Sequence, residues 1–378
     1  MKKVFSAILA LTLVLTCLVG CANNAGSGGS VTGSGDSSGS TVAAPAEKIT
    51  WKVQGYTAAG TLYDTYGKQL ADSITEMSGG RLTIEWYAAD SIVTVAEGPA
   101  AVRDGILDAV FDYTGVWSNV DEAFPLFCSS PGLFADPLDM VGWMYEGGGQ
   151  DLWQKAMDDF NMNCHTILAG THDMEDWMWS NKPIVEIDDM RGITTRMMPV
   201  MGNILSENGI NVAFISGTEI VANMERGVID AGEYSIPALD QTFGFQDVAK
   251  YVARPGFHQP CATQQLAINK DKWNALPDDL KAIVEYACQA NVLNMMTNVT
   301  SLNVDSLDYF ESLGITVTQL SDDAIKTLQE WTDAYYAKHA IEGTLMKEII
   351  DSQNAYIKKI AAYKDTLEMP YPAWAYED

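Results

Sequence analysis

The hydrophobic and polar positions of the chain follow two periods after the first fifty residues. Short apolar or alternating runs, which are typical of strands, occupy residues 50–54, 81–87 and 107–113. Apolar positions three and four residues apart, which are typical of helices, lie between them in residues 61–77 and 97–103. A chain that alternates strand and helix in this way predicts an α/β fold.

A second copy of part of this pattern appears in the middle of the chain. The segment "RDGILDAVFDY" (residues 103–113) is echoed by "ERGVIDAGEY" (residues 225–234). In each copy a glycine, Gly105 or Gly227, suits the left-handed position that ends a helix, so each copy predicts a helix, a turn and a strand. Two similar lobes whose strand ends face each other would enclose a cleft, where open α/β sheets bind ligands. A chance likeness of two amphipathic helix–strand pairs is the alternative.

Helical spacing dominates the last third of the chain. It covers residues 273–290, 324–338 and 344–367, and "MPYPAW" ends the last of these segments. A long C-terminal helix either braces two lobes or reaches a second subunit, and the sequence leaves both open.

The N-terminus has the pattern of an export signal and a tether. Two lysines precede an apolar run over residues 4–18, and "LVGC" then ends at Cys21. This order predicts a lipoprotein signal peptide over residues 1–20, whose removal leaves Cys21 to carry a lipid anchor. The run is shorter than the ~20 residues that cross a bilayer, which favours a cleaved signal over a permanent membrane helix. Residues 21–47 are rich in Gly and Ser and predict a flexible tether, so we expect an extracytoplasmic body anchored to the cell membrane.

An excess of acidic residues gives the chain a formal net charge of −27 at pH 7. This charge makes nucleic acid and anionic lipid headgroups poor partners. An anionic small molecule would need a shielded positive group for its capture, and the chain has only six arginines to supply one.

The cysteines do not form the pattern of a disulfide framework. Cys128, Cys164, Cys261 and Cys288 are widely spaced and form no CxxC motif. A folded body of about 330 residues buries enough core to fold without covalent staples, so buried free thiols are expected.

Several motifs, taken in order, resemble those of a known family. They include "EMSGGRLTIEWY", "VWSNVDEAFPLF", "DDMRGITTRMMP" and "NKDKWNALPDDLKAIV". Over residues 49–290 the chain resembles the extracytoplasmic solute-binding proteins of TRAP transporters, the DctP-like family. It is most similar to the branch that binds small 2-oxo or 2-hydroxy monocarboxylates, such as pyruvate or lactate, together with a metal cation. The resemblance implies a two-lobed, periplasmic-binding-protein-like α/β fold with a hinge cleft and long C-terminal helices.

The resemblance also implies how the chain divides and what it meets. Lobe 1 is expected from residues 48–168 plus about 259–300, and lobe 2 from residues 169–258 plus about 301–340. A C-terminal helix and tail are expected over residues 341–378. The implied partner is the membrane permease of a TRAP transporter, and the long C-terminal helices leave a homodimer open.

Four residues carry the ligand site that the resemblance implies. Arg196 matches the family arginine that forms a two-pronged salt bridge to the ligand carboxylate, a task suited to a planar guanidinium. A structural ion pair with a nearby acid is the alternative for Arg196. Glu233 and Tyr234 match the pair that gives a side-chain oxygen and a backbone carbonyl to the metal, although the branch usually has Trp where Tyr234 stands. Glu175 lies 21 residues before Arg196, where the branch has a glutamine that touches both cation and ligand.

The glutamate at position 175 changes the charge expected in the cleft. Glu175 and Glu233 would repel each other and an anionic ligand unless a cation lay between them. Two carboxylates suit Ca²⁺ better than Na⁺, so Ca²⁺ is the expected ion and Na⁺ the alternative. Without a cation, Glu175 would have to hold a proton or face an amino group of the ligand.

Further candidate contacts lie at or beyond strand ends. In lobe 1 the candidates are Tyr113, Trp117, and either Gln54 or Tyr56. Aromatic residues at such positions are more often part of the core than of a ligand site. In the segment "FHQP" the candidate is Gln259, with Gln265 as its substitute.

The stretch "THDMEDWMW" holds three acidic residues, and the register to the arginine singles out Glu175 among them. Asp173 and Asp176 are expected near solvent or behind the ligand contacts. Trp179 is expected to pack at the boundary between the lobes.

An enzyme is the less favoured class. The chain has no GxSxG or HExxH motif, and its "EGGGQ" lacks the Lys-Ser/Thr of a phosphate loop. His172 beside Asp173 imitates a metal pair, but a lone exposed pair of this kind is usually polar surface. The alternatives are a secreted hydrolase with Glu175 and Glu233 as paired carboxylates, a cation-free binder of a sugar acid or aromatic acid, and a signalling receptor with the same ligand site.

Overall fold

The structure, a computed structural model, describes residues 48–134, 136–367 and 372. The predicted signal peptide, the predicted tether and Cys21 lie outside these residues. Among the helices that the structure describes, none is long and apolar enough to cross a membrane.

In the described part of the chain, one sheet has five strands in the order β2-β1-β3-β10-β4. Its strands are β1 (Ile49–Gly55), β2 (Leu82–Tyr87), β3 (Ala109–Asp112), β4 (Cys164–His172) and β10 (Ala262–Asn269). β1 runs parallel to β2 and β3, and β10 runs antiparallel to β3 and β4. Helices α1 (Leu62–Met77) and α2 (Gly98–Arg103) connect the parallel strands, in the order that the hydrophobic pattern predicts.

A second sheet, also within the described residues, has six strands in the order β11-β9-β5-β8-β6-β7. Its strands are β5 (Met178–Ser180), β6 (Thr194–Arg196), β7 (Asn211–Ala213), β8 (Ala231–Gly232), β9 (Tyr251–Arg254) and β11 (Thr316–Gln319). β6 runs parallel to both β7 and β8, so the C-terminal ends of these three strands lie at the same edge of the sheet.

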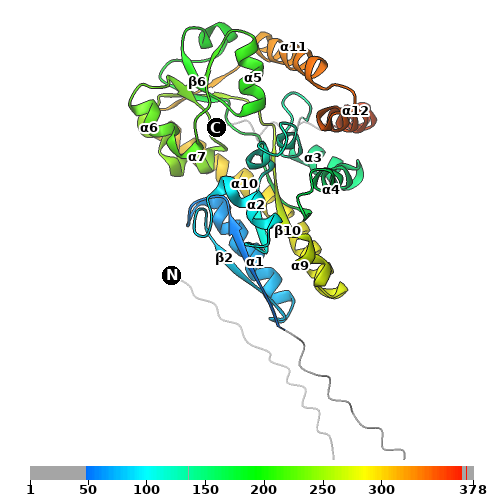
Figure 1. The fold of residues 1–378 in the computed structure, drawn as a ribbon. Coiled ribbons are helices and arrows are strands. Elements are labelled where there is room, and N and C mark those ends of the chain that lie inside the picture. Colours follow the sequence, from blue (N-terminus) through cyan, green and yellow to red (C-terminus); the bar gives the residue numbers. More distant parts are fainter. Residues whose placement is uncertain (1–47, 135, 368–371, 373–378) are drawn as a thin grey trace, which may run out of the picture. The chain divides into compact units, whose positions relative to one another are not determined.

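Helices flank both sheets (Figure 1). The remaining α-helices are α3 (Pro137–Glu146), α4 (Gly149–Asp159), α5 (Pro199–Glu207), α6 (Ile220–Glu225), α7 (Pro237–Phe243), α8 (Phe245–Val248), α9 (Lys270–Ala275), α10 (Asp278–Ser312), α11 (Asp322–His339) and α12 (Leu345–Lys364). Short 3₁₀ helices are η1 (Val95–Glu97), η2 (Thr114–Trp117), η3 (Phe124–Phe127), η4 (Ile187–Met190) and η5 (Gly217–Glu219).

The internal repeat has the local structure that its sequence predicts. α2 is followed by Gly105 and then β3, and α6 is followed by Gly227 and then β8. Both glycines have positive φ angles, +75° and +67°, which is the left-handed conformation expected at a helix end. The repeat therefore ends one parallel strand in each sheet just before Tyr113 and just before Glu233.

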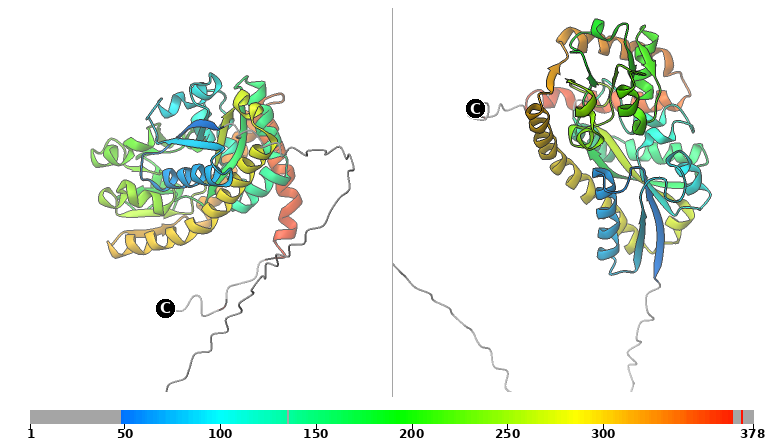
Figure 2. Two further views of the ribbon diagram at one scale, coloured as in Figure 1. Left: turned by 90° about the horizontal axis from the view of Figure 1, so that it is seen from below. Right: turned by 90° about the vertical axis from the view of Figure 1, so that its left-hand side faces the viewer.

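Three connections cross between the two sheets. Residues 173–177 lead from β4 to β5, residues 255–261 lead from β9 to β10, and α10 returns the chain to β11. α10 contacts α1 and β4 on one side and α7 and β11 on the other, and Figure 2 shows it passing along both sheets. α10 is longer than the helix predicted over residues 273–290. The prediction was too short because the second half of α10 buries polar residues, such as Asn303 and Ser306, that interrupt the apolar period.

The C-terminal helices brace the two halves within one chain. α11 packs on α5 beside the second sheet, and α12 packs on α3, α4 and η3 beside the first sheet (Figure 1). The Nε2 group of Gln353 in α12 donates a hydrogen bond of 3.0 Å to the carbonyl of Leu126. Lys338 in α11 forms an ion pair of 2.8 Å with Glu207 at the end of α5. This is the bracing role that the sequence left open.

The buried core corrects one expectation and meets another. Trp179 was expected at the lobe boundary, but it lies in β5 inside the core of the second sheet. Its ring packs against Phe245 and Phe310, with ring centroids 5.5 and 4.9 Å away. The four cysteines that the structure describes are all buried and free, as expected for a body that needs no disulfides.

Candidate functional site

Strand pairing brings Arg196 and Glu233 together. Arg196 is the last residue of β6 and pairs with Gly232 of the parallel strand β8, so Glu233 follows directly beside it. Nη1 of Arg196 donates to Oε1 of Glu233 and to the Glu233 carbonyl oxygen, both at 2.7 Å. Nε of Arg196 donates to the carbonyl of Ile215 at 3.2 Å. Both side chains are buried, Glu233 completely.

The guanidinium has one nitrogen left for a ligand. Nη2 of Arg196 has only the thioether sulfur of Met198, at 3.7 Å, among the described residues. The expected two-pronged contact uses two adjacent nitrogens, but here Nη1 and Nε already donate to Glu233 and Ile215. In this structure Arg196 therefore offers Nη2 alone, and the ion pair raised as its alternative role is present.

The first segment that crosses between the sheets positions Glu175. Its backbone N–H donates to the carbonyl of Gln259, on the second crossing segment, at 3.1 Å. Gly256 lies so close that a Cβ atom there would be 2.2 Å from the Glu175 carbonyl oxygen. A glycine is therefore required at position 256 for the two crossing segments to meet at Glu175.

The carboxylate of Glu175 lies among two histidines and a glutamine. Nε2 of Gln259 donates to Oε1 at 2.8 Å, and Nε2 of His258 lies 3.2 Å from Oε2. Nε2 of His172 lies 3.7 Å from Oε1. Nδ1 of His172 donates to the carbonyl of Asp173 at 2.7 Å, so its Nε2 presents a lone pair to Glu175.

Burial and charge act against each other in this cluster. Burial raises the pKa of Glu175, although contact with His258 opposes the rise. Burial would also raise the pKa of Glu233, but the Arg196 charge holds that pKa below its usual value. Burial would lower the pKa of His258, whereas contact with both glutamates raises it. Burial lowers the pKa of His172 to about 4, which leaves this ring neutral.

One carboxylate oxygen in the cluster has no hydrogen bond. Oε2 of Glu233 is buried and finds no donor among the described residues, and Nε2 of His258 is 3.7 Å away. Ligand atoms of Glu175, Glu233 and His258 all lie within 4.8 Å of one another, close enough to share one metal ion. A buried unpaired carboxylate oxygen is costly, so this arrangement fits a site built for an added positive group.

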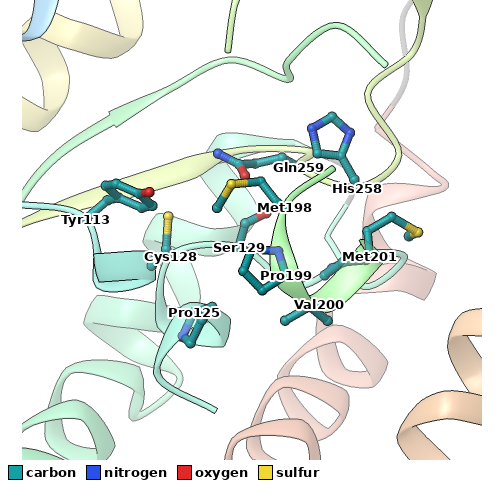
Figure 3. A pocket seen from close by; sticks show the side chains of 12 residues that line it. Tyr113, Pro125, Cys128, Ser129, Met198, Pro199, Val200, Met201, His258 and Gln259 are labelled. Carbon is teal, nitrogen blue, oxygen red and sulfur yellow. The ribbon is translucent and has the colours of Figure 1, made fainter. Parts of the chain in front are cut away.

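A small cavity adjoins the cluster, with about 20 Å³ that a water-sized sphere can reach. His258 and Gln259 line it from the crossing segment, Tyr113 and Ser129 from the side of the first sheet, and Met198 from the side of the second. Figure 3 shows the side chains of Met198 and Gln259 between Tyr113 and His258. Arg196, Glu175 and Glu233 do not line this cavity but are buried next to the residues that do.

Tyrosine rings form a second group close to the cluster. The ring of Tyr56 lies 5.2 Å from Tyr113 and 5.9 Å from Tyr63, centroid to centroid. The hydroxyls of Tyr63 in α1 and Ser235 after β8 form a buried hydrogen bond of 3.0 Å that joins the two halves. Tyr234, directly after Glu233, packs against Phe243 with ring centroids 4.2 Å apart.

Three predicted contacts lie away from the cavity, and the structure gives a reason for each. Trp117 is completely buried, and its indole N–H donates to Asp112 at 2.8 Å. Gln265 is completely buried in β10 and donates to the other oxygen of Asp112 at 2.8 Å. The amide of Gln54 holds the loop at residues 92–93, where Nε2 donates to the carbonyl of Val93. These polar groups are satisfied by the protein itself, so we no longer assign them to ligand contact.

Two acidic residues of the 171–179 stretch have structural partners. Asp173 accepts a hydrogen bond of 2.7 Å from Thr300. Asp176 was expected near solvent or behind the ligand contacts; it is not near solvent, because it is completely buried directly after Glu175 and forms an ion pair of 3.0 Å with Arg254. His172, expected as polar surface, is also buried.

Sequence reasoning missed His258. It lies one position before the predicted Gln259, inside the quoted "FHQP", yet nothing in the local pattern shows that its ring faces two glutamates 83 and 25 positions earlier. The available signal was indirect, since a histidine on a segment already assigned to the cleft is a candidate ligand for the same ion.

The fold and the cluster define a class. Two α/β halves joined by crossing segments, with buried charges gathered on those segments, are the architecture of a binding protein that takes a solute between two lobes. The chain belongs to the bacterial extracellular solute-binding proteins of family 7, the DctP family, whose sequence model matches residues 54–343. The proteins of this family and the solved structures most like this chain are solute-binding receptors and not enzymes. The predicted family, two-lobed fold and non-enzymatic class are confirmed, and the hydrolase alternative is set aside.

The chain is similar to three characterised or solved proteins. A monocarboxylate 2-oxoacid-binding periplasmic protein of Nostoc sp. (strain PCC 7120) is 26% identical over 307 residues, which cover 81% of this chain and 83% of that protein. A TRAP transporter solute-binding protein of Bordetella bronchiseptica, with copurified calcium and picolinate, has a TM-score of 0.79 at 20% identity and covers 85% of this chain and 95% of its own. One from Pseudoalteromonas atlantica, with bound sodium and pyruvate, has a TM-score of 0.79 at 22% identity and covers 85% of this chain and 97% of its own.

Proposed function

We propose that this chain captures a small 2-oxo or 2-hydroxy monocarboxylate, such as pyruvate or lactate, together with a cation, and delivers it to the permease of a TRAP transporter. The observation that carries the proposal is the buried cluster in which one arginine with a free nitrogen adjoins two glutamates. The likeness to a 2-oxoacid-binding protein and to structures that hold pyruvate or picolinate with a metal supports it.

Arg196 is the proposed anchor of the acid's carboxylate. Its charge is buried, so it is shielded from the overall charge of −27 that would repel an anion in solvent. The two N–H groups of Nη2 have no oxygen acceptor among the described residues, and a carboxylate oxygen is their natural partner. A ligand bound in this way would contact Arg196 without breaking its ion pair with Glu233.

Glu175 and Glu233 are the proposed ligands of the cation, with the Tyr234 carbonyl as the expected backbone donor. The unpaired Oε2 of Glu233 and the nearby Oε2 of Glu175 supply the oxygen atoms that such an ion requires. When bound, the ion would neutralise the two carboxylates and polarise the oxygen at position 2 of the acid. Calcium and sodium are the ions present in the two solved relatives.

The size of the cavity supports a small ligand. About 20 Å³ of it is open to a water-sized sphere in this structure, so a bound acid has to be small and its entry has to widen the space. Tyr113, Tyr234 and Gln259 are the proposed remaining contacts, and Tyr113 and Gln259 line the cavity.

We also propose that the two halves close about residues 173–177 and 255–261 when the acid binds. The first half extends beyond the predicted end of lobe 1 at residue 168, because β4 stays in the first sheet as far as His172. The hydrogen bond between Tyr63 and Ser235 supports this movement, because it joins the two halves next to the cluster. Calorimetric titration of the body with pyruvate and lactate tests the function, first with Ca²⁺ and then after chelation with EDTA.

The expected result is tight binding of at least one of the two acids with Ca²⁺, a large loss of affinity in EDTA, and recovery when the ion returns. Unchanged affinity in EDTA would remove the cation and favour the cation-free alternative, in which Arg196 and His258 neutralise the two glutamates. No heat with any 2-substituted acid would remove the proposed ligand class. Mass spectrometry of ligand and metal carried through native purification provides an independent check.

We propose, finally, that a lipid on Cys21 holds the protein at the outer face of the cell membrane. The "LVGC" sequence supports this assignment. Replacement of Cys21 by Ser should move the protein from the membrane fraction to the soluble extracytoplasmic fraction. A wild-type protein that is soluble and carries no lipid by mass would contradict it.

A further inference from the structure

The candidate cation site contains a nitrogen donor as well as oxygen donors. Nε2 of His258 lies 3.2 Å from Oε2 of Glu175 and 3.7 Å from Oε2 of Glu233. All three side chains are almost completely buried, and Oε2 of Glu233 has no hydrogen-bond donor among the described residues. The unpaired oxygen and the imidazole nitrogen therefore face the same point.

These separations suit the coordination sphere of one small ion. Donor atoms bound at about 2.1 Å from an ion lie about 3.0 Å apart at right angles and about 3.4 Å apart at the tetrahedral angle. The distances from His258 Nε2 to the two carboxylates are close to these values, and all three donor atoms lie within 4.8 Å of one another.

An ion at this site would replace a proton on His258. Without an ion, Nε2 of His258 lies 3.2 Å from Oε2 of Glu175, a carboxylate oxygen that accepts its N–H. Nδ1 has no hydrogen-bond partner among the described residues, so it can keep the remaining ring proton when Nε2 loses its own to an ion. The ring itself is held by Trp177, whose ring packs edge-on against it with centroids 5.5 Å apart. The position of the ring is thus fixed, and its Nε2 becomes an electron-pair donor once the ion displaces its proton.

A second imidazole, that of His172, lies on the other side of Glu175 and also indicates a positive group in this cluster. His172 donates Nδ1–H to a backbone carbonyl at 2.7 Å, the arrangement that commonly orients a metal-binding histidine. Its Nε2 lone pair then faces Oε1 of Glu175 at 3.7 Å. Two electron-pair donors that face each other in a buried site repel unless a positive group lies near them.

Nitrogen donors change which ion a site prefers. Ca²⁺ takes oxygen ligands almost exclusively, whereas imidazole suits Zn²⁺, Cu²⁺, Fe²⁺ and Ni²⁺. We propose that His258 is a ligand of the bridging cation in this protein, and that the site therefore binds a divalent ion of the first transition series in preference to Ca²⁺ or Na⁺. This inference rests on the proposed function and narrows the class of its ion.

The charges of the loaded site agree with a divalent ion. Glu175, Glu233 and the carboxylate of the acid bring three negative charges, while Arg196 and a divalent ion bring three positive charges. A monovalent ion would leave one negative charge unbalanced in a buried site, which is unfavourable.

Direct metal titration tests the inference without any ligand. Co²⁺ and Ca²⁺ are titrated separately into metal-free wild-type protein, into His258→Gln and into the control His339→Gln. The control removes a half-exposed histidine that pairs with Glu207 on α5, outside the cluster. The His258→Gln change replaces the nitrogen donor by an amide oxygen of similar reach.

We expect wild type and His339→Gln to bind Co²⁺ at least about tenfold more tightly than Ca²⁺. We expect His258→Gln to lose about 10–100-fold in Co²⁺ affinity, with a much smaller change for Ca²⁺. A wild-type preference for Ca²⁺, or an equal loss of both ions in His258→Gln, would overturn the assignment.

A spectroscopic readout covers the case in which His258→Gln fails to fold. Pulsed electron paramagnetic resonance of His339→Gln loaded with one equivalent of Cu²⁺ should show the remote nitrogen of a coordinated imidazole, and its absence would overturn the proposal. Pyruvate is then added to the Co²⁺-loaded and Ca²⁺-loaded proteins. Pyruvate binding with no preference for Co²⁺ would contradict only the role of His258, whereas a clear preference for Co²⁺ without pyruvate binding would contradict only the proposed ligand.

Discussion

Replacement of Arg196 by Met is the perturbation whose outcome the structure defines most closely. Glu233 is completely buried, and its Oε1 and its carbonyl both accept hydrogen bonds of 2.7 Å from the Arg196 guanidinium. The change would leave a buried carboxylate without a charge partner, and removal of one partner of such a pair costs about 3–5 kcal/mol. For a protein of this size we expect a fall in Tm of roughly 5–15 °C.

The loss of ligand affinity has a separate magnitude. In this structure Arg196 offers only Nη2 to a carboxylate, which corresponds to one charge-assisted contact rather than two. A hydrogen bond to a charged group contributes about 1.5–3 kcal/mol, so the Kd for pyruvate should rise by a factor of roughly 10–150. If a ligand instead displaced Glu233 and took two nitrogens, the loss would be about the square of this factor.

The double variant Arg196→Met/Glu233→Gln separates the two effects. It removes both charges, and the loss of a whole buried pair is often neutral for stability, so its Tm should return most of the way to the wild-type value. Its affinity for pyruvate should stay low, because the group that contacts the carboxylate is still missing.

The assays are differential scanning calorimetry for stability and isothermal titration with pyruvate well below the lowest Tm. Wild-type affinity in Arg196→Met would refute Arg196 as the anchor of the acid. A double variant as unstable as the single variant would refute the argument that the unpaired Glu233 charge causes the instability.

Three further changes test other parts of the site. Gly256→Ala places a Cβ atom 2.2 Å from the Glu175 carbonyl oxygen, so it should lower the free energy of unfolding by about 1–3 kcal/mol in urea and weaken pyruvate binding in titration. Wild-type stability and affinity would contradict the close approach of the two segments. Tyr63→Phe removes the hydrogen bond to Ser235 that joins the two halves. It should raise the Kd for pyruvate by about 2–12-fold and leave the affinity for Co²⁺ unchanged. An unchanged Kd for pyruvate would show that this hydrogen bond does not favour the closed form. Burial raises the pKa of Asp112 to about 7, so the contribution of its protonated carboxyl to stability is complete below about pH 4 and is lost as the pH rises to 7. Asp112→Asn should therefore flatten the decline of Tm between about pH 4 and 7, and an unchanged slope would contradict the raised pKa.

The sequence predicted those parts of the site that follow from strand geometry. The repeat placed Glu233 at the end of a predicted strand, and the family resemblance singled out Arg196, which the structure shows at the end of β6. Because β6 and β8 are parallel neighbours, the two residues lie side by side. Periodicity could also predict most helices, since their buried faces are apolar.

The rest of the site depends on packing between segments far apart in the sequence. His258 and Glu175 lie on two different connections, and neither connection has an apolar period. Only the folded structure therefore shows that the two side chains meet. Trp117 was assigned to the cleft because it follows a strand end, yet its indole N–H is used by Asp112 in the core. α10 was predicted too short because its buried polar residues, such as Asn291 and Asn303, interrupt the pattern that a one-face helix would show.

The two connections that carry the site are also two of the three that join the halves, the third being α10. Glu175 belongs to residues 173–177, His258 and Gln259 belong to residues 255–261, and the N–H of Glu175 bonds to the Gln259 carbonyl between them. A twist of either connection changes the distances between Glu175, His258 and Gln259. The affinity for the solute therefore depends directly on the angle between the two halves. A permease that bound both halves from outside and rotated one relative to the other would lower the affinity for the solute and release it. The permease would not need to place any side chain of its own in the cavity.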